Sequence, residues 1–274
     1  MKEYKIIDAH CHIYPDKIAV KASESTGNFY SIPMCLDGKI STLLETGVSA
    51  GIDHFIVQSV ATTPKQVSSI NNFIANSVEN SKGLFTGLGT LHPDSEDIKA
   101  DVDEIINLGL KGVKLHPDIQ KFKIDDYRML KIYELCEGRL PILIHTGDHR
   151  YDFSNPNRMM PILDIYKDLT VIGAHFGGWS IWEEASKKLS HYDNFYVDCS
   201  SSLYAITPEK AKELIMEYGT DKVLFGTDYP MWDAKSEIER FMEIDLSEKE
   251  REDIFYNNAA KLFDIKNDFF LKNY

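Results

Sequence analysis

Eight short runs rich in β-branched residues recur along the chain, and their spacing restricts the fold more than any other feature. They begin near Tyr4, His54, Leu84, Gly112, Pro141, Val171, Phe195 and Val223. Most steps between them are roughly 30 residues long, which is enough for one strand and one crossover helix. The sequence therefore predicts a repeated β/α unit.

The segments between the runs carry helix signals. The expected helices cover residues 40–51, 97–110, 125–138 and 208–219. Asp97 precedes apolar residues at helical spacing and is a typical N-cap residue, while Pro208 suits a first helical position. Eight strands that alternate with helices predict an α/β fold, a (β/α)8 TIM barrel that forms one domain over residues 1–274.

An open, doubly wound sheet is the alternative architecture. Such a sheet usually has about five to seven strands and a glycine-rich phosphate loop after the first. Here the first run ends in His10, Cys11 and His12 instead. A chain of 274 residues, 43% of them hydrophobic, also suits a barrel with a large core.

The excess of acidic residues narrows the set of partners. The chain has 43 Asp and Glu against 30 Lys and Arg, and a net charge of −13 argues against nucleic acid and anionic membranes. We expect a small-molecule substrate, and the sequence is compatible with a homo-oligomer. The lack of a long apolar run or a signal peptide, together with four scattered cysteines, predicts a cytoplasmic protein with reduced thiols.

The step after the first strand is longer than the others by roughly 20 residues. The surplus lies in residues 14–37, and loops at this end of a barrel strand face the substrate. We therefore predict a lid insertion, with a tolerated surface loop as the alternative. Phe29, Tyr30 and Met34 favour a lid with an apolar underside.

Histidines concentrate at the ends of the predicted strands. Six of the nine fall in the last strand positions, where random placement would put about one. They are His10, His12, His92, His116, His145 and His175. Because TIM-barrel enzymes keep their chemistry at the carboxyl ends of the strands, this clustering predicts an active site at the barrel mouth.

His10 and His12 lie two residues apart on one strand, so strand alternation turns both toward the barrel interior, with Ile7 and Ala9 toward the helices. Two neighbouring imidazoles suit zinc or a similar divalent ion. The first and eighth strands are neighbours in a closed barrel. Asp228, at the end of the eighth, can therefore complete the site.

His145 and His175 end the fifth and sixth runs, and glycine follows closely after each. Glycine allows a tight turn or a close approach to a ligand. Either histidine alone is typical of a hydrogen-bonded core residue. Together with the histidine pair and Asp228, they indicate a functional site.

In these motifs the chain resembles the amidohydrolase superfamily, in the branch that includes aminocarboxymuconate-semialdehyde decarboxylase-like enzymes. The resemblance covers nearly the whole chain and rests on IIDAHCHIYP, GVKLHP, PILIHTG, VIGAHFGG, VLFGTDYP and IFYNNAAKLF. It implies that His10, His12, His145 and Asp228 hold one divalent ion, with zinc the expected metal. It also implies that His175 either acts in catalysis or orients a metal-binding side chain without contacting the ion itself.

Such a site implies a metal-dependent hydrolase that cleaves an amide, ester or lactone bond of a small anionic substrate. The ion would lower the pKa of bound water to about 7, Asp228 would accept its proton, and His175 would polarise the carbonyl. The alternative is non-oxidative decarboxylation of a small unsaturated or aromatic carboxylic acid, since the branch contains both reactions. A non-catalytic metal-binding barrel is a third, less favoured hypothesis.

Lys114 and His116 share the fourth strand, and the resemblance places both in the substrate pocket. A buried lysine needs a partner, so an ion pair with Asp8 is one alternative. A second alternative is a carboxylated Lys114 that bridges two metal ions, as in binuclear relatives.

Arg150 and Trp179 follow the fifth and sixth strands. A cation near the mouth of an acidic protein suggests an anionic substrate, so we predict that Arg150 binds it and that Trp179 walls the pocket. A solvated loop is the alternative for Arg150, and ordinary packing is the alternative for Trp179.

Overall fold

Short parallel strands form the centre of the molecule in a computed structural model that describes residues 4–266. The strands are β1 (Ile7–His12), β2 (His54–Gln58), β3 (Phe85–Gly87), β4 (Gly89–Thr90), β5 (Val113–Leu115), β6 (Ile142–Ile144), β7 (Val171–Gly173), β8 (Phe195–Asp198) and β9 (Val223–Leu224). They lie at the eight predicted runs, with β3 and β4 sharing the third.

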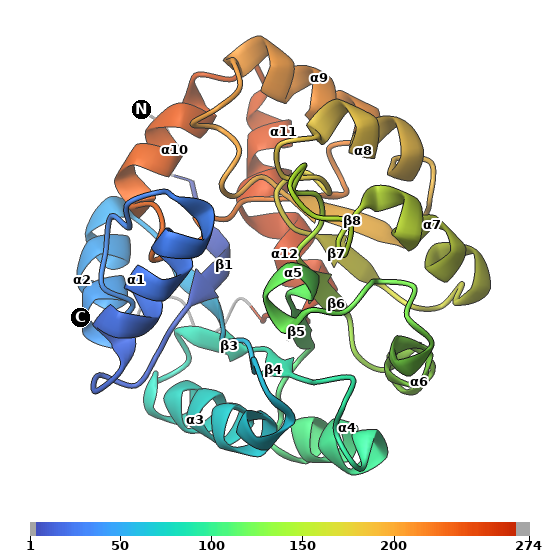
Figure 1. The fold of residues 1–274 in the computed structure, drawn as a ribbon. Coiled ribbons are helices and arrows are strands. Elements are labelled where there is room, and N and C mark those ends of the chain that lie inside the picture. The colour runs from blue at the N-terminus through green and yellow to red at the C-terminus, as the bar shows by residue number, and fades with distance from the viewer. Residues whose placement is uncertain (1–3, 267–274) are drawn as a thin grey trace.

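Helices alternate with the strands and surround them (Figure 1). The α-helices are α1 (Ala19–Tyr30), α2 (Ile40–Ala50), α3 (Val67–Asn80), α4 (Ile98–Asn107), α5 (Pro117–Gln120), α6 (Tyr127–Cys136), α7 (Pro156–Ile165), α8 (Trp182–Leu189), α9 (Pro208–Tyr218), α10 (Ala234–Met242), α11 (Glu248–Glu252) and α12 (Asn258–Leu262). A 3-10 turn, η1 (Pro64–Gln66), precedes α3, and a π-helical turn, η2 (Asp253–Asn257), joins α11 to α12. Asp97 caps α4 by accepting a hydrogen bond from Ala100 N at 3.0 Å.

Backbone hydrogen bonds close the strands into a barrel. The pairing order is β1-β2-β3 and β4-β5-β6-β7-β8-β9, all parallel. Leu88 N donates to Val57 O and Gly89 N to Gly112 O, so β3 and β4 are two halves of one strand. Ala9 N donates to Phe225 O at 2.9 Å, which joins the last strand to the first. The predicted single-domain TIM barrel is therefore confirmed, and the open sheet is excluded.

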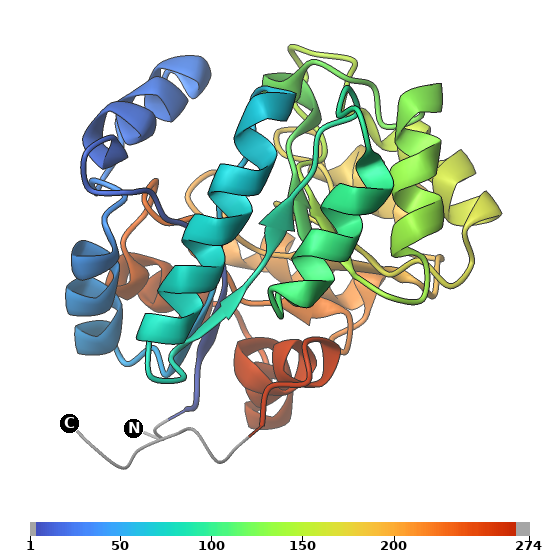
Figure 2. The ribbon, with the colours of Figure 1, turned by 90° about the horizontal axis from the view of Figure 1, so that it is seen from below.

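Two apolar clusters make up the core. The larger one fills the space between the barrel and its helices. The smaller one lies inside the barrel, where Leu88, Leu143, Ile172 and Leu224 meet Phe263, which follows α12. Figure 2 shows α12 (red) and α1 (blue) at opposite ends of the barrel. The inner cluster and α12 therefore close one end of the barrel, and the mouth lies at the other.

A β-bulge corrects the predicted facing of the first strand. The register with β2 shifts between Asp8 and Cys11. Ile7 and Ala9 consequently pack inside the barrel rather than against the helices, while Cys11 belongs to the outer cluster. Simple alternation was the wrong assumption here because a bulge inserts one extra residue and changes which side chains share a face.

Part of the predicted insertion forms α1, which lies over the mouth end of the barrel (Figures 1 and 2). Whether residues 14–37 open and close as a lid stays a prediction. Within residues 4–266, no helix combines the length and the apolar character needed to cross a membrane.

Truncation of Leu143 tests the inner core. Leu143 is buried inside the barrel, so Leu143→Ala should lower the free energy of unfolding by about 2–5 kcal/mol, the usual cost of a core cavity. The matched control is Leu130→Ala on α6, where the side chain is 37% exposed and the loss should stay below about 1 kcal/mol. Urea denaturation measures both. Equal losses would contradict a packed barrel interior.

Candidate metal centre and active site

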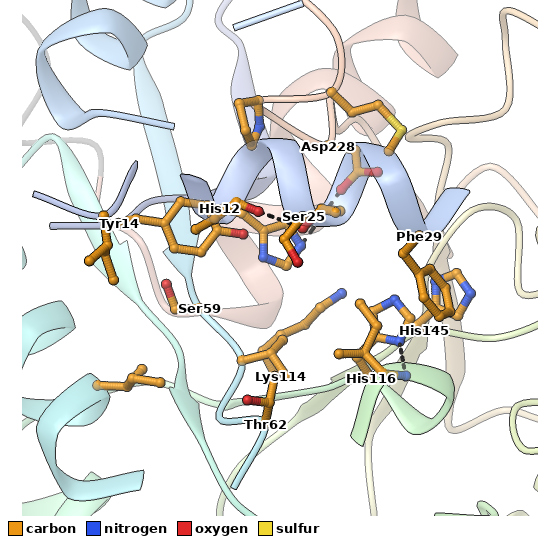
Figure 3. A pocket seen from close by; sticks show the side chains of 18 of the residues that line it. His12, Tyr14, Ser25, Phe29, Ser59, Thr62, Lys114, His116, His145 and Asp228 are labelled. Carbon is orange, nitrogen blue, oxygen red and sulfur yellow. Dashed lines mark hydrogen bonds and ion pairs between the residues drawn. The ribbon is translucent and has the colours of Figure 1, made fainter. Parts of the chain in front are cut away.

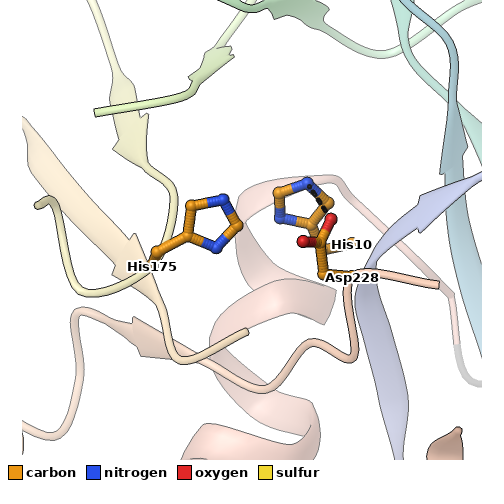
Figure 4. A group of neighbouring side chains, drawn as sticks. All are labelled: His10, His175 and Asp228. Atoms are coloured by element: carbon orange, nitrogen blue, oxygen red, sulfur yellow. Dashed lines mark ion pairs between the residues drawn. The ribbon is translucent and has the colours of Figure 1, made fainter. Parts of the chain in front are cut away.

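Three side chains from the two joined strands meet at the centre of the mouth. His10 Nε2 lies 3.2 Å from His12 Nε2, and Asp228 Oδ1 lies 3.4 Å from the first nitrogen and 3.6 Å from the second. Ligand atoms bound at about 2.0–2.1 Å to one tetrahedral ion stand about 3.3 Å apart. The donor set therefore fits a divalent ion in both chemistry and spacing. His175 supplies a further nitrogen within 4.8 Å of the donor atoms of His10 and Asp228 (Figure 4).

Asp198, at the end of β8, holds His10 and His175 in position by accepting a hydrogen bond from each. His10 Nδ1 donates to Asp198 Oδ2 at 2.9 Å, and the backbone N–H of His175 donates to Oδ1 at 3.1 Å. A proton on Nδ1 leaves the lone pair of His10 Nε2 free for a metal. His175 Nδ1 donates to Ser200 O at 3.0 Å, so its Nε2 also carries a lone pair.

Asp228 sits in a left-handed backbone conformation, with φ of +61°, just after β9. Ser201 Oγ donates to Asp228 Oδ2 at 2.6 Å, while Oδ1 faces the histidine pair. Burial raises the pKa of Asp228 to about 7, against the opposing effects of the Ser201 hydrogen bond and the Lys114 charge. Burial also lowers the pKa of His175 to about 4. The imidazole is therefore neutral at physiological pH.

Lys114 points into the same centre. Its Nζ lies 3.0 Å from His10 Nε2, and burial lowers its pKa to about 8. Asp8 instead accepts hydrogen bonds from Thr227 N at 2.9 Å and Thr227 Oγ1 at 2.6 Å. In the described residues the alternative Asp8–Lys114 ion pair does not form. The Lys114 side chain therefore points toward the candidate metal centre and not toward Asp8.

His145, predicted as a metal ligand, stands to one side. Its ring stacks on that of His116 with centroids 4.1 Å apart, and its Nε2 lies 3.5 Å from Asp118 Oδ2. With Asp118 and Asp148 it forms a second group of ligand atoms within 4.8 Å. The structure thus brings His10, His12 and Asp228 together and leaves His145 beside them, so its role as a ligand stays a prediction.

Tyr30, at the end of α1, was not predicted as a site residue, yet its hydroxyl reaches the mouth. His116 Nδ1 accepts a hydrogen bond from Ile119 N at 3.3 Å, which puts the ring proton on Nε2. That nitrogen then donates to the Tyr30 oxygen at 2.6 Å. The Tyr30 hydroxyl hydrogen remains available for His145, 3.4 Å away, or for a ligand.

Arg150 and Trp179, both predicted to contact substrate, lie behind Tyr30. Arg150 binds Asp148 through two nitrogens and donates to the Phe29 carbonyl at 2.8 Å. Its guanidinium also lies over the rings of Phe29, Tyr30 and Trp179 at 5.2–5.5 Å. These contacts hold α1 in place. Direct substrate binding by either residue stays a prediction.

A cavity of about 500 Å³ opens onto the centre (Figure 3). At its inner end it is lined by His10, His12, Tyr30, Lys114, His116, His145, His175 and Asp228. Among the residues that the structure describes, Lys114 is the only lysine or arginine in the lining. The cavity can therefore hold a small organic molecule with one anionic end at the candidate metal centre.

A (β/α)8 barrel with ligand atoms gathered at the carboxyl ends of its strands defines a metal-dependent TIM-barrel enzyme. Residues 7–265 match the sequence profile of the family described as Amidohydrolase. The chain belongs to this amidohydrolase family, and the resemblance drawn from the motifs is confirmed.

The chain is similar to decarboxylases and to a putative hydrolase. Gamma-resorcylate decarboxylase from Polaromonas sp. is 28% identical over 123 residues, which cover 38% of this chain and 37% of that protein. A dihydroxybenzoic acid decarboxylase structure from Polaromonas sp., with bound manganese and 2-nitroresorcinol, has a TM-score of 0.75 at 18% identity, covering 97% of this chain and 99% of that one. A putative 2-pyrone-4,6-dicarboxylic acid hydrolase from Pseudomonas putida has a TM-score of 0.66 at 20% identity, covering 99% and 100%.

Replacing Asp198 tests the orientation of the metal ligands. Asp198→Asn keeps the shape but removes the charge that holds the proton on His10 Nδ1, so metal affinity should fall about 10–100-fold. Competition with a chromogenic chelator measures the affinity. Asp193→Asn, on the exposed turn before β8, is the matched control and should bind metal as the wild type does. Unchanged affinity in Asp198→Asn would contradict this assignment.

Proposed function

We propose that the chain is a metal-dependent, non-oxidative decarboxylase of a small hydroxylated aromatic acid. The observation that carries the proposal is the position of Lys114, whose ammonium group lies at the buried end of the cavity beside the converging donors of His10, His12 and Asp228. A substrate carboxylate can contact that cation and the metal centre together. The decarboxylases among the relatives support the same choice of reaction.

His10, His12 and Asp228 would hold the ion, with His145 as the predicted fourth ligand. When bound, the ion supplies a Lewis acid that fixes the carboxylate and phenolic oxygens of the substrate. Manganese, present in the Polaromonas structure, is now as strong a candidate as the zinc expected from the sequence. Lys114 keeps its proton at neutral pH because its pKa is about 8, so it pairs with the carboxylate.

The reaction exchanges a carbon–carbon bond for a carbon–hydrogen bond. An acid of the protein gives a proton to the ring carbon that bears the carboxyl group. The electron pair of the breaking bond then returns to the ring, and carbon dioxide leaves. Asp228 and His175 flank the inner end of the cavity. Asp228, with a pKa of about 7, is the proposed acid, and His175, with a lone pair on Nε2, is the proposed base beside it. The free hydroxyl hydrogen of Tyr30 can hold a phenolic oxygen of the substrate.

Lactone hydrolysis is the second candidate, since the sequence alone favoured a hydrolase. Asp228 Oδ1 faces the histidine pair while its other oxygen is held by Ser201, an arrangement that suits a carboxylate accepting a proton from water. The similarity to a dicarboxylic acid hydrolase also favours it. A non-catalytic barrel is set aside because the family is one of enzymes.

Isotope incorporation separates the two reactions. Manganese-loaded protein incubated with 2,6-dihydroxybenzoate in deuterated water should release carbon dioxide and leave deuterium on the resorcinol ring. His175→Asn should lower kcat by about 100-fold or more, the usual contribution of an acid–base group. The exposed His191→Asn is the control and should keep full activity. Incorporation of 18O from water into an opened lactone, with no carbon dioxide release, would favour the hydrolase instead.

A further inference from the structure

The cavity continues outward past the histidines. Beyond the strand ends, its lining includes Tyr14, Ile18 and Ala22 from the segment after β1, and Ile70 and Phe73 of α3. Figure 3 shows Tyr14 on the far side of the cavity from His145. Because α3 lies outside the barrel (Figure 1), these residues form a second region of the cavity, which we call the outer arm.

Charge is confined to the inner end of the cavity. In the lining formed by described residues, Lys114 is the only lysine or arginine and Asp228 the only acidic residue, and neither belongs to the outer arm. Gln66 accepts from Thr62 N at 2.8 Å and Thr63 N at 3.1 Å through its amide oxygen, so toward the cavity it offers only a neutral N–H donor and no cation. A carboxylate in the outer arm would lose water without gaining a cation, whereas an apolar group would gain contacts.

We infer that the substrate is a monocarboxylic acid that carries an apolar substituent on the side of the ring remote from the carboxyl group. This inference rests on the proposed function, because it places the carboxyl group at Lys114 and the substituent in the outer arm. It also distinguishes this cavity from one built for a dicarboxylic acid, which needs a cation at each end. The apolar side chains of Ile18, Ala22, Ile70 and Phe73 would contact the substituent.

Calorimetric binding to the manganese-loaded protein tests the outer arm without requiring turnover. The probes are resorcinol and its 5-methyl, 5-ethyl and 5-propyl derivatives. These phenols correspond to what carbon dioxide loss would leave from 2,6-dihydroxybenzoates substituted opposite the carboxyl group. Affinity should rise by up to about fourfold per buried methylene, so the propyl compound should bind about tenfold or more tighter than resorcinol.

Two exposed isoleucines provide a matched pair of variants. Ile18 lines the outer arm and is 51% exposed, whereas Ile165 lies at the end of α7 and is 64% exposed. Ile18→Arg should remove most of the affinity gained with the propyl group, because a cationic side chain replaces part of the apolar wall. Ile165→Arg should leave the whole series unchanged.

Equal affinities across the alkyl series, or an Ile18→Arg variant that binds the series like the wild type, would each overturn the inference. Failure of the proposed decarboxylation would give a different set of results from failure of the outer-arm assignment. In that case 2,6-dihydroxybenzoate would release no carbon dioxide while the alkyl series kept its rising affinity. The assignment of the outer arm would then stand without the decarboxylase.

Discussion

Closure of the barrel between β1 and β9 is the constraint on which the site depends. Ala9 N bonds to Phe225 O, His12 N bonds to Tyr229 O, and Asp8 accepts from Thr227, so two segments more than 200 residues apart in the chain are held side by side. This contact alone puts Asp228 within reach of the two histidines of β1. The inner apolar cluster and α12 fill the opposite end of the barrel, so polar chemistry is restricted to the mouth.

The spacing of the apolar runs was sufficient to predict all eight strand positions and the barrel, and the positions of histidines at strand ends were sufficient to find the mouth. Strand alternation failed in β1 because the pairing register, and hence the bulge, depends on a partner strand. Asp198 was missed although it also ends a strand, because its function appears only through contacts with His10 and His175. The sequence singled out Arg150 as a cation near the mouth. Its hydrogen bond to the Phe29 carbonyl could not be predicted, because the two residues lie 121 positions apart.

Both decarboxylases and a putative hydrolase are found among the proteins that this chain resembles. The carboxylate and histidines at the strand ends can serve either reaction, so what differs is the rest of the cavity. Here Lys114 provides one cation at the inner end, and α1 provides the Tyr30 hydroxyl together with an apolar wall. In this proposal the insertion after β1 would select the small molecule that fits, while the barrel would supply the chemistry.

The position of the metal tests this account most directly, because every proposed role is defined relative to it. Anomalous X-ray diffraction from crystals of the manganese-loaded protein locates the ion independently of activity. The account predicts one peak in contact with His10, His12 and Asp228. A peak only between Asp118, His145 and Asp148, the second group of ligand atoms, would contradict it.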